Sequence, residues 1–135
     1  MNNKPLIRFK GFTDPWEQHK LKNFCSISTG HLDANAMEQN GKYDFYTSGV
    51  DIYKINTFAF EGPSITIAGN GANVGFLHLA EGKFNAYQRT YVLYDFKLDR
   101  LFLYYAISKL LPKKIKEEQR ASNIPYIVIE LLNNL

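Results

Sequence analysis

A glycine-rich segment near the middle of the chain has the composition of a ligand-binding loop. The string ITIAGNGANVG, residues 65–75, passes from a strand-like stretch into glycines at positions 69, 71 and 75. A loop of this kind can hold the pyrophosphate of a dinucleotide, and Asp95 stands about 20 residues further on, where such sites place a ribose-binding acid. Dinucleotide binding is therefore the first chemistry that the sequence suggests.

The residues after this loop argue against a dinucleotide site. A Rossmann loop holds pyrophosphate because a helix N-terminus follows it directly and presents free N–H groups. Here the string VGFLHLAEG, 74–82, alternates like a strand, and no Gly-Lys-Ser/Thr string closes a Walker loop. The glycines instead predict a tight connection between neighbouring strands, for which an ordinary glycine turn is the alternative interpretation. Its main chain and amides could approach a base edge closely, and the candidate residues are Gly69, Asn70, Gly71 and Asn73.

A second candidate lies in the string AYQRTY, where Gln88 and Arg89 stand at the start of a strand-like run. In the major groove of DNA, Gln pairs with adenine and Arg pairs with guanine. Arg89 could equally form a structural ion pair with a nearby carboxylate. For a chain that binds duplex DNA, Gln88 and Arg89 are therefore candidate base-reading residues.

A third candidate is the segment 28–49, which is rich in Gly, Asn, Ser and Asp and has an Asn-Gly turn signal at 40–41. It predicts a long loop or hairpin, and loops of this length inside a domain are usually functional. Its candidates for mixed phosphate and base contacts are Lys42, Tyr43, Tyr46, Thr47 and Ser48. The two tyrosines could equally be half-buried sheet residues.

Other reactive side chains form no catalytic or metal-binding pattern in the sequence. His19, His31 and His78 are scattered, and no Ser or Cys stands with them in a nucleophile signature. Cys25 is the single cysteine, so it can form no internal disulfide, and no second Cys suggests a zinc site. Strings for S-adenosylmethionine binding and amino methylation are also missing. We therefore expect no catalysis and no cofactor.

Composition indicates one ordinary globular domain. The chain has 135 residues, of which 45% are hydrophobic and 21% charged, enough to form a core without metals or disulfides. The aromatic share of 15% suits sheets and, through Tyr, recognition surfaces. A net charge of +3 permits a polyanionic partner without requiring one. The N-terminus lacks the apolar core of a signal peptide, and no stretch is long enough for a membrane span, so we expect a cytoplasmic protein.

Three strand-like runs and one helix must position these candidates. The strand-like runs are 64–68, 74–80 and 90–96, each bounded by Gly or Asn. Residues 98–111 predict an amphipathic helix with Asp99 in its first turn and Pro112 just past its end. The mixed-charge run 113–120 predicts a solvated helix or loop, and 12–23 is ambiguous between helix and strand. The predicted fold is α+β, with a twisted, antiparallel or mixed sheet and one main amphipathic helix.

The ordered strings of the chain resemble the target recognition domain of type I restriction-modification specificity subunits. The resemblance runs from about Arg8 to Leu135 and rests on RFKGFTDPWEQHKL, STGHLDANAM, GKYDFYTSG, ITIAGNGANVGF, GKFNAYQRTYVLY and ASNIPYI. It implies a non-enzymatic module that recognises one half of a split double-stranded DNA target. A modification (methyltransferase) subunit and a restriction subunit would supply the chemistry, and residues 16–21 would form a strand.

Two departures from the family pattern concern domain organisation. The chain carries one recognition domain instead of two, and it ends near where the spacer helix would begin. It therefore resembles a single recognition domain, residues 1–135, that corresponds to the N-terminal half of a specificity subunit. The alternative hypothesis is a protein–protein interaction module whose Tyr-rich loops dock a partner protein.

Overall fold

The computed structural model describes residues 20–122 and 126–135. Most of the strand expected at 16–21 lies outside these residues, and its last residue, Leu21, begins a 3-10 helix instead. The elements in chain order are η2 (Leu21–Asn23), β1 (Ser26–Thr29), η3 (Ala34–Ala36), β2 (Tyr43–Tyr46), β3 (Ile52–Ile55), β4 (Phe60–Glu61), β5 (Ser64–Ala68), β6 (Leu77–Ala80), β7 (Lys83–Ala86), β8 (Thr90–Tyr94), α1 (Arg100–Ser122) and α2 (Ile129–Asn133).

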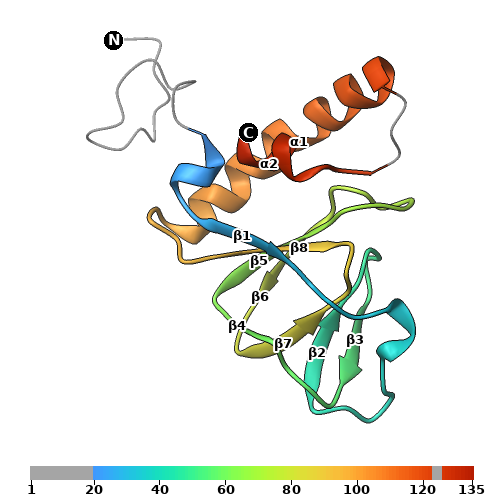
Figure 1. Ribbon diagram of the computed structural model, residues 1–135. Helices are drawn as coiled ribbons and strands as arrows, with labels where there is room; N and C mark the ends of the chain where they lie inside the picture. The colour runs from blue at the N-terminus through green and yellow to red at the C-terminus, as the bar shows by residue number, and fades with distance from the viewer. Residues whose placement is uncertain (1–19, 123–125) are drawn as a thin grey trace.

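The strands form two four-stranded sheets. The first sheet has the order β1-β8-β5-β6 and is antiparallel throughout. The second has the order β3-β2-β7-β4, in which β2 and β7 are parallel and the outer pairs are antiparallel. Figure 1 shows α1 and α2 on one side of the first sheet and the second sheet on the other side. The α+β class is confirmed: the three predicted strand-like runs contain β5, β6 and β8, which lie in one antiparallel sheet, while the second sheet was not predicted.

The central strands of the first sheet, β5 and β8, are buried on both faces because a layer covers each face. Ile65 and Ile67 of β5 pack with Leu103 and Ile107 of α1 in one hydrophobic cluster. The alternate residues of the sheet, represented by Val92 of β8, pack against Tyr46, Phe84 and Ala86 of the second sheet in another cluster. All five residues of β5 are consequently buried. This pattern is typical of a central strand with both faces covered.

The observed strands match the predictions where the apolar runs are strong. The run 64–68 coincides with β5, while 74–80 and 90–96 contain the shorter strands β6 and β8. The segment expected to be a long loop contains β2, and Gly41 N donates to Glu38 O at 3.0 Å in the predicted turn. Strands β1, β3, β4 and β7 were not predicted, because each is only two to four residues long and runs this short carry little periodic signal.

Helix α1 is longer than predicted and contains Pro112 in its interior. A proline inside a helix costs about 3 kcal/mol. The buried positions Leu103, Ile107, Leu111 and Ile115 recur every four residues, so one apolar stripe continues across the proline. Burial of this stripe offsets the cost and carries the helix through the charged run 113–120.

The start and the exposed face of α1 also differ from the prediction. Asp99 precedes the helix rather than lying in its first turn, and its Oδ2 accepts a hydrogen bond from Phe102 N at 3.0 Å, as an N-capping residue does. Leu101 and Tyr105, two apolar residues of the run 98–111 that predicted an amphipathic helix, do not lie on its buried face and are 47% and 65% exposed. Neither α1 nor α2, the two α-helices of the described residues, is long and apolar enough to cross a membrane.

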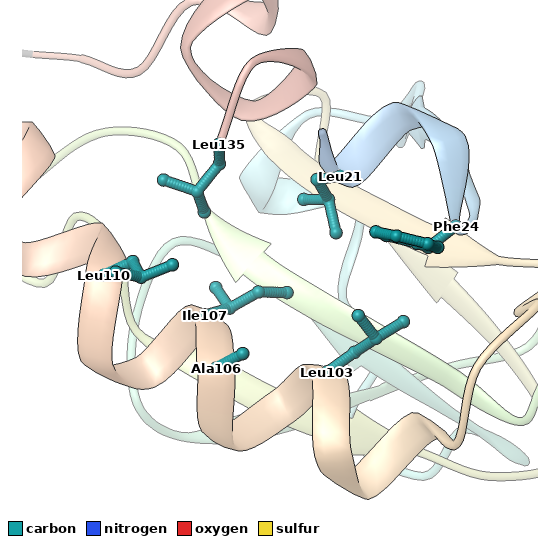
Figure 2. Close-up of a pocket in the computed structure, with 7 residues that line it drawn as sticks. All are labelled: Leu21, Phe24, Leu103, Ala106, Ile107, Leu110 and Leu135. Atoms are coloured by element: carbon teal, nitrogen blue, oxygen red, sulfur yellow. The ribbon is translucent and has the colours of Figure 1, made fainter. Parts of the chain in front are cut away.

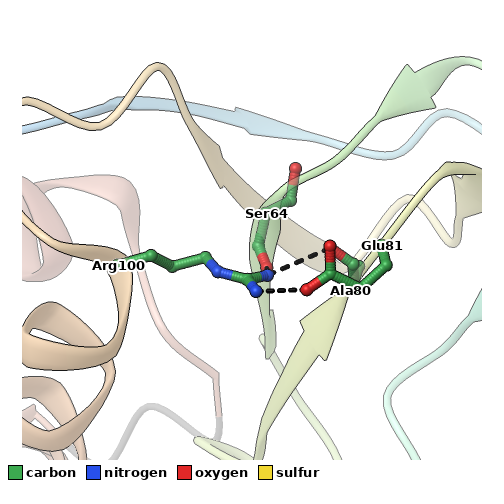
Figure 3. A network of polar contacts seen from close by, with 4 residues as sticks. All are labelled: Ser64, Ala80, Glu81 and Arg100. Carbon is green, nitrogen blue, oxygen red and sulfur yellow. Dashed lines mark hydrogen bonds and ion pairs between the residues drawn. The ribbon is translucent and has the colours of Figure 1, made fainter.

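Arg100 ties the start of α1 to the first sheet (Figure 3). Its Nη1 donates to the main-chain oxygens of Ser64 at 3.0 Å and Ala80 at 3.2 Å. Its Nη2 forms an ion pair with Glu81. The guanidinium thus bridges the end of β6 and the start of β5, two antiparallel neighbours, and fixes the helix over them.

We predict that Arg100→Ala lowers the free energy of unfolding by about 2–3 kcal/mol, because two main-chain oxygens lose a charged donor. Urea unfolding followed by circular dichroism measures the change. Lys97→Ala removes an exposed cation close by in the sequence and should change the free energy by less than about 0.5 kcal/mol. Equal effects of the two substitutions would contradict the role given to Arg100.

Candidate functional site

Two loops emerge side by side because β2 and β7 are parallel neighbours. Parallel strands end at the same edge of a sheet, and Tyr46 at the end of β2 pairs in register with Ala86 at the end of β7. Tyr87 N then donates to Tyr46 O at 2.9 Å. The loop 47–49 and the turn 87–89 therefore start from adjacent points.

The glycine loop, 69–76, reaches the same place from the first sheet. It connects the antiparallel neighbours β5 and β6, as predicted, and β6 follows it where a dinucleotide site would need a helix. Gly69 N donates to Arg89 O at 2.8 Å. A methyl group built on Gly71 would lie 3.7 Å from Ser48 Oγ. We call the surface formed by 47–49, 69–76 and 87–89 the three-loop surface.

Glycine is required where these loops approach one another. A methyl group on Gly69 would lie 2.3 Å from the main-chain oxygen of Arg89, so no larger residue fits without moving the turn. Gly71 has a φ of 82° and Gly75 a φ of 92°, in the left-handed region that favours glycine. The glycines thus serve the shape of the loop, which presents the side chains between them.

A fourth segment, 126–127, joins this surface and was missed at the level of sequence. Ile127 N donates to Gly69 O at 2.8 Å, and Tyr126 pairs with Asn70 in an antiparallel bridge. Tyr91 Oη donates to Ile127 O at 2.8 Å. Tyr126 is 46% exposed. No local pattern could reveal this pairing, because only tertiary structure brings the two segments together.

A polar hollow lies where the turn 87–89 meets segment 126–127. Its volume is about 110 Å³, and its lining consists of Thr29, Gly69, Gln88, Arg89, Tyr91, Tyr126 and Ile127. It adjoins a wider depression of about 470 Å³ that shares Thr29, Arg89 and Tyr126 with it. A guanidinium beside hydroxyl groups and an aromatic ring can bind an anionic or hydrogen-bonding group.

A different hollow beneath η2 is unsuited to such chemistry. Figure 2 shows apolar side chains from η2, α1 and the C-terminal end of the chain pointing toward one another. Its lining residues are Leu21, Phe24, Leu103, Ala106, Ile107, Leu110 and Leu135. Most of them belong to or pack against the core under α1. We therefore place the candidate site at the three-loop surface.

Most of the predicted contact residues lie on the three-loop surface. Gln88 and Arg89 are exposed, and Arg89 has no carboxylate within ion-pair distance among residues 20–122 and 126–135. Asn73 is exposed, whereas Asn70 is partly buried. In the described part of the chain Oδ1 of Asn70 is buried and has no hydrogen-bond donor. An acceptor of this kind is costly unless a donor reaches it.

Tyr46 is a core residue, which corrects its prediction as a contact residue. Only 2% of it is exposed, and its ring packs edge-on against Phe84 with centroids 5.4 Å apart. Burial, followed by the charges of Asp44 and Glu81, raises the pKa of Tyr46 to about 12. Thr47 is 8% exposed, and its Oγ1 accepts a hydrogen bond from Gly49 N at 3.2 Å, so it shapes its loop.

Lys42 and Tyr43 lie at the opposite end of β2 from the three-loop surface. Tyr43 pairs with Ile55 at the start of β2, whereas the loop 47–49 follows its end. The ring of Tyr43 packs against Phe58 with centroids 5.2 Å apart, as expected of a half-buried sheet residue. Lys42 is exposed. The structure thus separates these two candidates from the others.

Titratable groups elsewhere offer no second centre of chemistry. Within the described residues, no three His, Cys, Asp or Glu side chains are grouped closely enough to hold a metal ion. Cys25 is buried, and burial raises the pKa of its thiol to about 12. A thiol with so high a pKa is a poor nucleophile near neutral pH.

Both the sequence and the fold match known proteins. Residues 13–135 match the family described as type I restriction modification DNA specificity domain. The type I restriction enzyme EcoDI specificity subunit of Escherichia coli is 41% identical over 112 residues, which are 83% of this chain and 24% of that protein.

Solved structures give the same result for the fold. The crystal structure of a type I restriction-modification system S subunit from M. genitalium has a TM-score of 0.71 at 22% identity, covering 87% of this chain and 32% of that one. A structure described as showing complex assembly and conformational transition of the type I R-M system has a TM-score of 0.64 at 19% identity, covering 86% and 32%. The chain spans 24–32% of the length of these relatives.

The burial of Tyr46 predicts a stability loss at high pH. Because its pKa is raised from 10 to about 12, the folded state favours the neutral phenol; this stability is fully present below pH 10 and is lost as the pH rises through 12. Tyr46→Phe should therefore lose less stability than the native chain between these pH values. Urea unfolding across this range tests it, with the 65% exposed Tyr105→Phe as the control, which should behave like the native chain.

Gly69→Ala should disrupt the three-loop surface, because the added methyl group would collide with the main chain of Arg89. We expect a loss of about 1–3 kcal/mol in the free energy of unfolding, in the range of overpacked sites. The control is Gly49→Ala, where φ is not in the left-handed region and a methyl group would meet only Thr47 Oγ1 at 3.7 Å, an ordinary contact. This control measures the effect of an added methyl group that fits. A cost at position 69 no larger than at position 49 would contradict the close approach.

Proposed function

This chain belongs to the family of type I restriction modification DNA specificity domains, and from that premise we propose that it reads the bases of one half of a bipartite duplex DNA target. We treat residues 1–135 as one target recognition domain that lies within the N-terminal half of a specificity subunit. Methylation and cleavage are assigned to a modification subunit and a restriction subunit that assemble with it.

The three-loop surface is the observation that supports this function most strongly. Sequence readers must hold amide, guanidinium and hydroxyl groups at the edge of a rigid scaffold. Here Asn73, Gln88 and Arg89 are exposed on loops whose main chains are hydrogen-bonded to one another. Loops held in this way order their side chains before binding, which lowers the entropic cost of complex formation.

We assign roles in DNA binding to the residues of the three-loop surface. Gln88 and Arg89 read base edges in the major groove, where Gln matches adenine and Arg matches guanine. The hydroxyls and main chain around the polar hollow, with Ser48 and Gly71, contact phosphate and sugar. Asn70 lies in the same surface, where its buried Oδ1 has no hydrogen-bond donor within the described residues. Lys42, Tyr43 and Tyr46 have no base-reading role.

The proposal is tested by selecting binding sites from random duplexes with the complete complex that contains this chain. We expect one fixed half-site, and we expect the methylation specificity of a related system to change when residues 1–135 replace its corresponding domain. If selection returned no fixed half-site and the exchange left methylation specificity unchanged, the proposed function would be wrong.

Single substitutions locate the reading surface. Arg89→Ala should cost about 1–3 kcal/mol in binding and relax the base preference at one position, as loss of a bidentate base contact does. Lys42→Ala also removes one cation, but from the opposite end of β2, and should leave the preferred sequence unchanged. Fluorescence anisotropy with the selected duplex and with single-base variants measures both effects. Similar relaxation by both substitutions would contradict this placement of the site.

A further inference from the structure

Gln88 is held by a neighbouring loop through its side-chain amide. Its Nε2 donates a hydrogen bond to Oδ1 of Asp33 at 3.3 Å. Both residues are exposed, so this pair lies at the surface rather than in the core. The amide is thereby oriented in the free protein, at the place where the proposed function needs it to meet a base.

Main-chain contacts bring the two partners together independently of their side chains. Leu32 and Tyr87 form an isolated parallel bridge, and Gln88 N donates to Leu32 O at 2.8 Å. Asp33 and Gln88 each follow directly after one of these bridged residues. The two side chains therefore start from positions that the backbone fixes.

The carboxylate of Asp33 does not cap the helix that follows it, although this residue type commonly does so. Asp33 is the N-cap of η3, where Asp commonly accepts hydrogen bonds from the first N–H groups of the helix. Its side chain makes no such bond, although its main-chain oxygen accepts one from Ala36 N at 3.1 Å. The carboxylate instead accepts from the amide of Gln88.

This arrangement determines which edge of the amide remains open. An amide nitrogen carries two hydrogens, so the one donated to Asp33 leaves a second donor hydrogen, and Oε1 stays free to accept. The amide therefore still offers one acceptor and one donor to a base. A reversed amide would place Oε1 against the carboxylate of Asp33, where two acceptors repel.

We propose that Asp33 is a positioning residue that makes Gln88 specific for adenine, an inference that rests on the proposed function. Adenine presents the N6 donor and the N7 acceptor in the major groove, which match the open edge of the amide. Guanine presents two acceptors, O6 and N7, so one of them would face Oε1. The Asp33 carboxylate thus discriminates between the purines through Gln88 and touches neither.

The test compares Asp33 variants in the complete complex by selection from random duplexes and by anisotropy with paired duplexes. The paired duplexes differ only by adenine or guanine at the position whose preference Gln88→Ala abolishes. Asp33→Ala should reduce the adenine-to-guanine affinity ratio about fivefold to tenfold, within the range of one bidentate base contact. Asp33→Asn brings a donor as well as an acceptor and therefore permits the reversed amide, so it should reduce the ratio as Asp33→Ala does. Since each ratio compares two duplexes with one protein preparation, a change in the folded fraction cancels.

Two further variants serve as controls. Glu61→Ala removes an equally exposed negative charge from β4, which pairs with the start of β7 rather than with its end. It should leave the ratio unchanged, whereas a general charge effect would alter it as Asp33→Ala does. In the Gln88→Ala background, Asp33→Ala should have no further effect on the ratio, because Asp33 acts only through Gln88.

Three results would overturn the inference while leaving the proposed function standing. The ratio could remain unchanged in Asp33→Ala, the affinity for all duplexes could fall equally, or the Gln88→Ala background could still show an Asp33 effect. A fourth result, in which the native complex selects no fixed sequence, would reject the proposed function itself. The outcomes are therefore distinguishable.

Discussion

Burial of the first sheet on both faces fixes the positions of all other elements. Ile65 and Ile67 face α1, while the alternate residues of the same sheet face the rings of the second sheet. If β5 shifted by one residue relative to its neighbours, the side chains that face α1 would face the second sheet, and those that face the second sheet would face α1. The ends of β5 and β8, from which the glycine loop and the turn 87–89 extend, are therefore held as rigidly as the core itself.

The second constraint is the parallel pair β2 and β7, which joins parts of the chain about 40 residues apart. Only this pairing places the loop 47–49 beside the turn 87–89, and the main chain of Gly69 then bonds to Arg89 on one side and to Ile127 on the other. The surface that we assign to DNA thus belongs to both sheets and to the C-terminal segment. It is a product of the complete fold rather than of any one motif.

The sequence predicts those elements of the fold whose residues have strong local preferences for a strand, a turn or a helix. The aliphatic run of β5 and the glycine loop were recognisable because β-branched residues favour strands and glycines favour turns. The helix boundary at Pro112 was misplaced because a local rule for proline ignores burial of Leu111 and Ile115. Tyr46 was assigned to a contact surface because Tyr suits both cores and interfaces, and only pairing across sheets distinguishes them.

The hydrogen bonds that hold the loops in place have an evolutionary consequence, because those between Gly69 and Arg89, Tyr87 and Tyr46, and Ile127 and Gly69 join main-chain atoms. Backbone groups are the same for every amino acid except proline, so exchange of Asn73, Gln88 or Arg89 would leave those bonds intact. Gly69 is the exception, since its lack of a side chain is what permits the approach of Arg89. A scaffold of this design can acquire a new target by point substitution while its shape persists, so its specificity can diversify faster than its fold.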